Sequence, residues 1–206
     1  MAYHSASRLK YLTTDVGSNG MDKQATKEVV LIRHGKPISA HNDKINAAQY
    51  TKWVRAYGKS ALDPQSTPKH KTHLNNSYVI VSPLRRAKLS AEYYGVDYID
   101  EECALLREMD IPYYKLPFRL KAWHWVLLSR MLWFFGMTGR FESFSSAKAR
   151  VAALTQRIEM LTEEHERLVL FGHGMTNLFT RKKLMKKGWR LKSKDSEFWG
   201  VTVLYK

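Results

Sequence analysis

The sequence predicts an α/β fold in three layers, with helices on both faces of a doubly wound, mainly parallel sheet. One reason is that short β-rich apolar runs alternate with segments whose apolar residues recur every three or four positions. A second reason is that two of these runs are nearly copies, Val-Val-Leu-Ile-Arg-His-Gly at 29–35 and Leu-Val-Leu-Phe-Gly-His-Gly at 168–174. A strand that stops at a histidine presents the imidazole at the carboxyl edge of the sheet, where open α/β folds place their ligand sites.

The first part of the chain is expected to supply two strands and one helix. Residues 28–32 form the first predicted strand, which is apolar enough to be buried. Residues 45–57 have the composition of a helix, and the Pro-, Ser- and Lys-rich stretch 58–76 that follows is typical of a loop. Residues 78–81 then form the second predicted strand.

A second helix is expected to begin directly after residue 81. Ser82 is suited to the N-cap position, and Pro83 is suited to the first helical position. Arg86 therefore falls in the first turn of this helix, just beyond the end of a strand. One face of the helix is expected to be buried, because apolar residues recur at three- and four-residue intervals: Leu84, Ala87, Ala91 and Tyr94.

The carboxyl-terminal part predicts two more helices and two more strands. A long helix leads into a strand at 168–171, and apolar spacing continues through Val151, Leu154, Ile158, Leu161, His165 and Leu168. Residues 175–186 form the next predicted helix, and residues 198–205 form the final strand.

The segment 118–137 differs from the rest of the chain because it is strongly aromatic and contains internal charges. It holds Trp123, Trp125, Trp133, Phe134 and Phe135, interrupted by Arg119, Lys121 and Arg130. Internal charges make it a poor transmembrane span. We expect an aromatic helical insertion, at about 112–142, that packs over the edge of the sheet. The alternative is a cationic, Trp-rich surface helix that contacts lipid or a partner.

Length and cysteine content indicate one domain in a reducing compartment. The 206 residues suit a single catalytic domain at 28–206, preceded by a polar segment at 1–27 that is expected to be poorly ordered. The single cysteine, Cys103, excludes an internal disulfide framework and a cysteine-based zinc site. The sequence shows no signal peptide, so we expect a cytoplasmic protein.

The net charge favours anionic partners. The chain carries 34 Lys and Arg against 19 Asp and Glu, a formal net charge of +15. The densest basic run, at 181–194, is interpreted as a solvated helix face plus a loop, with a phosphate-rich partner or a membrane surface as the alternative. Nucleic acid is the less favoured partner.

Four cationic or imidazole side chains are expected to converge at one sheet edge. Arg33, His34, Arg86 and His173 each lie at or just past the carboxyl end of a predicted strand. Arginine is suited to bidentate contact with phosphate oxygens. A histidine nitrogen can attack phosphorus, and a carboxylic acid can protonate the leaving oxygen. The pattern therefore predicts phosphoryl-transfer chemistry.

These motifs resemble the histidine phosphatase superfamily, which includes the cofactor-dependent phosphoglycerate mutases. The resemblance extends from about Glu28 to the carboxyl terminus. Its motifs are Leu-Ile-Arg-His-Gly at 31–35, Ser-Pro-Leu-Arg-Arg-Ala at 82–87, Leu-Arg-Glu at 106–108, Glu-Ser at 142–143 and Gly-His-Gly at 172–174. The resemblance implies a phosphoglycerate mutase-like fold.

The resemblance also implies a role for each matched residue. His34 would be the nucleophile that becomes phosphohistidine, and Arg33, Arg86 and His173 would bind the transferred phosphoryl group. Glu108 would protonate the leaving group and then assist the attack of water. No metal and no cofactor are implied. Other carboxylates lie near Glu108 in the sequence and remain alternatives for the proton donor: Glu101, Glu102 and Asp110.

Two departures from the family pattern affect the expected activity. Mutases of this group usually continue Arg-His-Gly with Glu-Ser, whereas this chain continues with Lys-Pro-Ile-Ser at 36–39. A proline in the substrate-contacting loop favours hydrolysis over glycolytic mutase activity. The short protein-phosphohistidine phosphatases lack a long insertion, so the aromatic segment points to a different substrate or to a lid.

The sequence therefore predicts a phosphatase that hydrolyses a phosphomonoester through a phosphohistidine intermediate on His34. The substrate would be a phosphorylated small molecule or a phosphoprotein, with peripheral membrane contact through the insertion as a further option. One alternative is phosphoryl transfer of the phosphoglycerate mutase type. Another is a non-catalytic member of the fold that binds a phosphorylated ligand or a partner protein.

Overall fold

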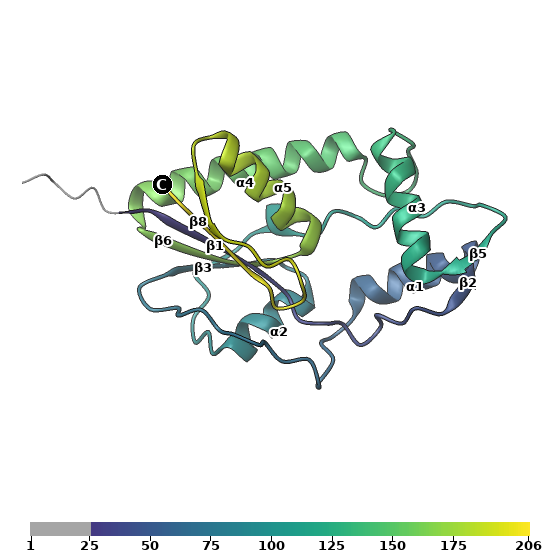
Figure 1. Ribbon diagram of the computed structural model, residues 1–206, viewed down its shortest axis with the longest axis horizontal. Helices are drawn as coiled ribbons and strands as arrows, with labels where there is room; N and C mark the ends of the chain where they lie inside the picture. Colours follow the sequence, from purple (N-terminus) through teal and green to yellow (C-terminus); the bar gives the residue numbers. More distant parts are fainter. Residues whose placement is uncertain (1–25) are drawn as a thin grey trace, which may run out of the picture.

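The computed structural model describes residues 26–206 and shows a six-stranded sheet between helical layers (Figure 1). Its strands are β1 Glu28–Arg33, β2 Lys44–Asn46, β3 Tyr78–Val81, β4 Glu101–Glu102, β5 Arg119–Lys121, β6 Arg167–Gly172, β7 Arg190–Ser193 and β8 Val201–Tyr205. Its helices are α1 Ala47–Lys59, α2 Arg85–Tyr94, α3 Ala122–Phe134, α4 Phe144–Glu164 and α5 Gly174–Lys186, with a 3₁₀ turn at Ala104–Leu106. Nearly all of the amino-terminal segment expected to be poorly ordered, residues 1–27, lies outside the described residues.

The strand order in the sheet is β4-β3-β6-β1-β8-β7. Strands β4, β3, β6 and β1 are mutually parallel, β7 runs in the same direction, and β8 runs opposite to the other five. Parallel neighbours require crossover connections, and helices supply them on both faces of the sheet. The predicted three-layer, mainly parallel α/β fold is confirmed.

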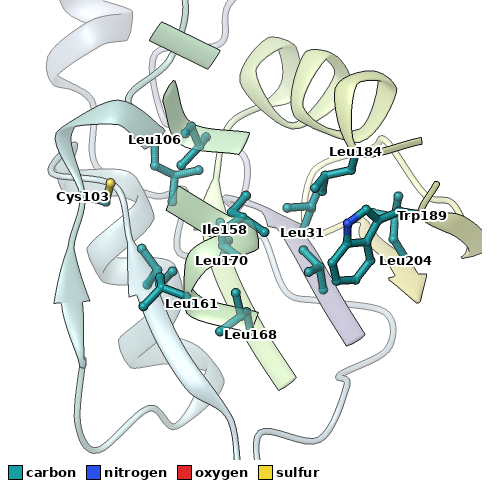
Figure 2. Close-up of a cluster of buried hydrophobic side chains, with 13 residues drawn as sticks. Leu31, Cys103, Leu106, Ile158, Leu161, Leu168, Leu170, Leu184, Trp189 and Leu204 are labelled. Carbon is teal, nitrogen blue, oxygen red and sulfur yellow. The ribbon is translucent and has the colours of Figure 1, made fainter. Parts of the chain in front are cut away.

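Alternate residues of the central strands pack on opposite faces of the sheet, as the two-residue period of a strand requires. Leu31 of β1 and Leu170 of β6 face α4 and α5, in the cluster shown in Figure 2. Ile32 and Phe171, the next residue along each strand, face α2. Both faces are therefore apolar, which explains why these strands read as continuous apolar runs in the sequence.

Several predicted boundaries are wrong by a few residues. Helix α2 begins at Arg85 with Leu84 as its N-cap residue, so Ser82 is not the cap. Helix α4 ends at Glu164, and the apolar spacing that continues to Leu168 belongs to the following strand. The final strand begins at Val201 rather than at residue 198.

The predicted loop after α5 is partly a strand. Residues Arg190–Ser193 form β7, which pairs with β8 at the edge of the sheet. The basic character of this run concealed it, because an edge strand exposed on one side keeps polar and charged residues.

The aromatic insertion lies beyond the carboxyl ends of the strands rather than over an edge of the sheet (Figure 1). Strand β5 pairs with β2, and α3 packs against α1, where Trp125 stacks on Tyr50 with ring centroids 5.3 Å apart. Trp133 packs against α4. The expected position was wrong because the large rings find partners on neighbouring helices. Within residues 26–206, no helix is long and apolar enough to span a membrane.

Candidate active site

The register of three parallel strands brings two histidines and a serine together at the carboxyl ends of these strands. Arg33 of β1 lies opposite Gly172 of β6, and Val81 of β3 lies opposite Phe171. The residues that follow these strands are therefore neighbours, with His173 between His34 and Ser82. The ring centroids of His34 and His173 are 5.0 Å apart. The two nearly identical segments of the sequence thus meet, as their pattern predicts.

His34 is held in one tautomer by its two ring contacts. Its Nδ1 donates to the carbonyl oxygen of Gly35 at 2.7 Å, and its Nε2 accepts from Nε of Arg86 at 3.0 Å. A nitrogen that accepts a hydrogen bond carries a lone pair, so the proton resides on Nδ1. Burial, and then the positive charge of Arg86, lower the pKa of His34 well below its usual value. His34 is therefore a neutral imidazole whose Nε2 is available as a nucleophile.

His173 is completely buried beside His34. Its Nε2 is 2.7 Å from Oγ of Ser82, and its Nδ1 has no hydrogen-bond partner among residues 26–206. Burial, and then the neighbouring His34 ring and Arg86, lower the pKa of His173 well below its usual value. Ser82 was interpreted from sequence as a helix cap, but its hydroxyl orients this imidazole instead. Its position directly after strand 78–81 was the available signal.

Arg86 connects the histidine pair to the adjoining cavity. It is only 2% exposed, and its Nη1 donates to the carbonyl oxygens of Tyr57 at 3.3 Å and Gly58 at 3.1 Å. These carbonyls lie in the last turn of α1, where the helix supplies few main-chain donors, and the carbonyl of Tyr57 also accepts from the main-chain nitrogen of Ser60. The end of α1 and the first turn of α2 thus hold the guanidinium against His34.

Glu108 lies at the amino terminus of α5, close to His173. Its Oε1 accepts from the main-chain nitrogens of Met109 at 3.0 Å and Thr176 at 3.2 Å. Main-chain N–H groups in the first turn of a helix stabilise a negative charge. Thr176, which the sequence did not single out, positions this carboxylate from the turn that follows the second His-Gly pair.

The other carboxylates near Glu108 in sequence have structural partners. Glu101 pairs with Arg157, and Glu102 pairs with Lys88. Asp110 accepts from Arg107 and from the main-chain nitrogen of Glu142, although it also lines the cavity described below. Glu108 is the one among these carboxylates that both lines the cavity and binds the turn after His173.

Arg33 lies beside the histidines but points toward the β7–β8 connection. Its Nη1 donates to the carbonyl oxygen of Ser196 at 2.7 Å, and its guanidinium carbon lies 4.1 Å from the centroid of the Phe198 ring. Arg33 does not line the cavity that Arg86 and Glu108 share, described below. Its phosphate-binding role stays a prediction.

Side chains approach closely to the glycines after the two histidines, most closely at Gly35. A Cβ at Gly35 would lie 2.4 Å from the indole of Trp199, and a Cβ at Gly174 would lie 3.2 Å from Nε of Arg33. In the structure a tryptophan and an arginine occupy those positions.

A cavity of about 220 Å³ adjoins the histidine pair. Arg86 and Glu108 line it, whereas the buried rings of His34 and His173 lie behind Arg86. The remaining walls come from the end of α1, from the N-cap of α2, from the residues on either side of Glu108 and from both ends of the insertion. These wall residues are Val54, Tyr57, Gly58, Leu84, Arg107, Met109, Asp110, Ile111, Tyr113, Arg140 and Phe141. The wall therefore combines three guanidinium groups with two carboxylates and an apolar surface.

A buried ion pair supports the segment that carries Glu108. Arg150 of α4 donates to both carboxylate oxygens of Glu142, each at 2.8 Å. The same guanidinium donates to the carbonyl oxygens of Leu105, Arg107 and Glu108. The family resemblance included Glu142 in a motif, but its partner Arg150, eight residues later, emerged only from the structure.

Acidification is expected to destabilise the fold through the two buried histidines. Both have folded-state pKa values below 6.5, so below pH 6.5 the unfolded chain binds protons that the folded chain does not. The free energy of unfolding should therefore fall by up to about 1.4 kcal/mol per histidine for each pH unit below 6.5. Urea denaturation at pH 7.5, 6.5 and 5.5 measures this slope.

The variant His34→Asn serves as the control for this pH dependence. It removes one of the two groups, so its free energy of unfolding should decline less steeply between pH 6.5 and 5.5 than that of the wild type. An unchanged slope in the variant would show that His34 titrates normally in the folded protein.

No group of three or more His, Cys, Asp or Glu side chains in residues 26–206 is arranged to hold a metal ion.

Comparison with known proteins identifies the fold. No family model and no curated protein matches the sequence. A phosphoglycerate mutase from Bacillus anthracis is similar in structure, with a TM-score of 0.55, 15% identity and 88% of each chain covered. An Escherichia coli protein described provisionally as an alpha-ribazole-5'-P phosphatase has a TM-score of 0.53 at 15% identity, covering 77% of this chain and 79% of its own. The product of a Mycobacterium tuberculosis open reading frame has a TM-score of 0.51 at 15% identity, covering 76% and 79%.

Proposed function

We propose that this chain, which has the phosphoglycerate mutase-like fold of the histidine phosphatases, hydrolyses a phosphomonoester through a phosphohistidine on His34. The observation that carries the proposal is the state of His34. Its Nε2 bears a lone pair, faces Arg86 at 3.0 Å and lies beside a second neutral imidazole. An uncharged histidine nitrogen within a cationic site is suited to attack on phosphorus.

The first displacement forms a bond between Nε2 of His34 and phosphorus and breaks the bond between phosphorus and the ester oxygen. The guanidinium of Arg86 moves its N–H from Nε2 to the phosphoryl oxygens, where it balances their negative charge. Protonated Glu108, on the cavity wall, donates its proton to the leaving oxygen.

The second displacement releases phosphate. Glu108, now a carboxylate, accepts a proton from water as that water attacks phosphorus. The bond between phosphorus and Nε2 breaks, and the lone pair returns to His34. The main-chain N–H groups of Met109 and Thr176 stabilise the carboxylate between the two displacements.

Hydrolysis is favoured over mutase activity by the segment after the first His-Gly pair. Residues 36–38 are held by pairing with residues 61–63: Ile38 donates to the carbonyl of Ala61, and Asp63 donates to the carbonyl of Lys36. Pro37 therefore belongs to a paired segment, where a mutase of this group usually has Glu-Ser.

We place the reaction in the cytoplasm, because a single cysteine suits a reducing compartment.

The cavity favours a compact substrate or a compact end of a larger one. A volume of about 220 Å³ is below the range of about 300–1,000 Å³ that is typical of drug-sized ligands. Apolar wall residues such as Ile111 and Phe141 suit a partly apolar alcohol. We therefore propose a small phosphomonoester as the substrate class.

The proposal is tested by phosphatase assay and by chemical trapping. The wild-type protein is expected to release p-nitrophenol from p-nitrophenyl phosphate, and inorganic phosphate or vanadate is expected to compete with this substrate. Denaturation during turnover with ³²P-labelled substrate should leave label on the protein that acid removes and alkali does not, as a phosphohistidine requires. Absence of turnover across a panel of phosphorylated metabolites and phosphopeptides would favour a non-catalytic phosphate-binding protein instead.

A further inference from the structure

Helix α3 is apolar on both faces, but only one face is covered. Its buried face packs on neighbouring helices through Ala122, Trp125 and Trp133. The opposite face carries what we name the apolar stripe: Leu127, Met131, Phe134 and Phe135. These side chains are 63%, 49%, 43% and 83% exposed. A helix that is apolar on all sides is normally buried on all sides. Phe134 contacts Phe144, with ring centroids 5.0 Å apart, but the rest of the apolar stripe faces outward.

Three of the four residues of the apolar stripe lie on one line along the helix. Leu127, Met131 and Phe134 are spaced by four and three positions, which places them above one another on an α-helical surface, and Phe135 adjoins them as the C-cap residue. The stripe begins two turns before the end of α3 and finishes at Phe135, the residue that caps it. It thus forms a continuous ridge rather than scattered exposed residues, which are common and need no explanation.

The part of the molecule that carries the apolar stripe is rich in cations. Strands β2 and β5 pair with one another, and α1 packs on α3, so residues 44–59 and 111–141 form what we name the helical lobe. The helical lobe contains no Asp and no Glu, and the flanking carboxylates Asp43, Asp110 and Glu142 lie directly outside its bounds. Apart from buried Arg130, its charged residues are exposed cations: Lys44, Lys52, Arg55, Lys59, Lys115, Arg119, Lys121 and Arg140.

An uncompensated charge of this kind argues against a second copy of the chain as the partner. In a two-fold symmetric dimer the same patch faces itself, so the cations of one helical lobe would meet those of the other. Four exposed side chains on a 13-residue helix also cover much less than the roughly 800 Å² per partner of a stable interface.

We propose that the apolar stripe docks on an anionic lipid bilayer. Helix α3 would lie in the plane of the interface, with the stripe at the boundary between headgroups and acyl chains. The exposed Lys and Arg residues of the helical lobe would contact the lipid phosphates, each adding to the attraction. The exposed ridge and the missing carboxylates carry the proposal, which does not depend on the catalytic activity of the protein.

Vesicle sedimentation tests the proposal with the full-length protein. The wild type is expected to sediment with vesicles of phosphatidylglycerol and phosphatidylcholine in equal parts, and about tenfold or more less strongly with phosphatidylcholine alone. The double variant Leu127→Ser/Phe135→Ser should lose about tenfold or more in partitioning to the anionic vesicles. Both residues are exposed, so the fold should be retained, and circular dichroism checks this.

Matched variants separate this surface from general basicity. Tyr98→Ser/Met160→Ser removes two residues that are 74% and 58% exposed elsewhere on the molecule, and it should bind like the wild type. Arg119→Glu/Lys121→Glu should abolish sedimentation. Lys186→Glu/Lys194→Glu makes the same change in net charge outside the helical lobe. This variant should bind anionic vesicles much more strongly than Arg119→Glu/Lys121→Glu does.

A second measurement is independent of sedimentation. A polarity-sensitive dye on Phe135→Cys should shift to the blue with anionic vesicles, whereas the same dye on Tyr98→Cys should not. Equal binding by wild type and the Leu127→Ser/Phe135→Ser variant would overturn the proposal. Equal losses of vesicle binding in the two charge-reversal variants, or absence of sedimentation by the wild type, would also overturn it. So would a wild-type dimer in solution that the Leu127→Ser/Phe135→Ser variant no longer forms.

Discussion

The variant His34→Ala is expected to lose phosphatase activity by a factor of about 10⁴ or more. Nε2 of His34 is the imidazole nitrogen that Arg86 contacts, so its removal eliminates both displacements rather than slowing one of them. Removal of a covalent nucleophile typically costs several orders of magnitude, and the residual rate reflects binding and electrostatic stabilisation alone. The measurement is kcat on p-nitrophenyl phosphate, together with the yield of acid-labile phosphoenzyme.

His165→Ala is the matched control for this loss. The ring of His165, the C-cap residue of α4, stacks on Tyr78 at the amino end of β3, whereas the candidate site lies at the carboxyl ends of the strands. Its removal should leave kcat near the wild-type value. If His34→Ala kept more than about a tenth of wild-type turnover with the same substrate, a phosphohistidine at this position would be ruled out.

The second large effect is expected from Arg150→Met, which should lower the free energy of unfolding by about 3–5 kcal/mol. The substitution removes both hydrogen bonds from Arg150 to buried Glu142, which keeps only its contact with the more exposed Arg107. It also removes the donor that the carbonyls of Leu105 and Arg107 share, although Thr176 still donates to the carbonyl of Arg107. Breaking a buried ion pair by removing one partner costs this much because the remaining charge is desolvated. Urea denaturation at pH 7.5 measures the change.

Arg157→Met provides the comparison on the same helix. Arg157 pairs with Glu101 at 2.8 Å, the same N–O distance as between Arg150 and Glu142, but its side chain is 41% exposed. Exposed pairs contribute between zero and about 1 kcal/mol, because water already solvates both charges. Similar losses in the two variants would mean that the pair between Arg150 and Glu142 is not effectively buried.

The sequence was sufficient to predict the strands that position the site. Both apolar runs that end in His-Gly are buried on two faces, so their composition could not be confused with a loop or an amphipathic helix. The short or exposed strands were missed. Strand β7 is basic and lies at an edge, while β2 and β5 have only three residues each.

Ser82 shows why local patterns mislead at a site. Serine before proline is a good helix-cap signal, yet its hydroxyl bonds to His173, which lies 91 positions later in the chain. A contact over that distance depends on which strands are neighbours, and cap statistics carry no information about it. The same holds for Thr176 at Glu108 and for Arg150 at Glu142.

The sequence by itself determined the alternation of strands and helices. It thereby also predicted that His34, Arg86 and His173 lie at the carboxyl ends of the strands. Strand periodicity and burial are local properties, so composition is enough to reveal them. Only the tertiary structure decided that Arg86 covers His34, that Arg33 points toward Ser196 and that α3 leaves an apolar ridge exposed. Those outcomes depend on packing between distant segments, where a few ångströms of geometry decide which side chains are in contact.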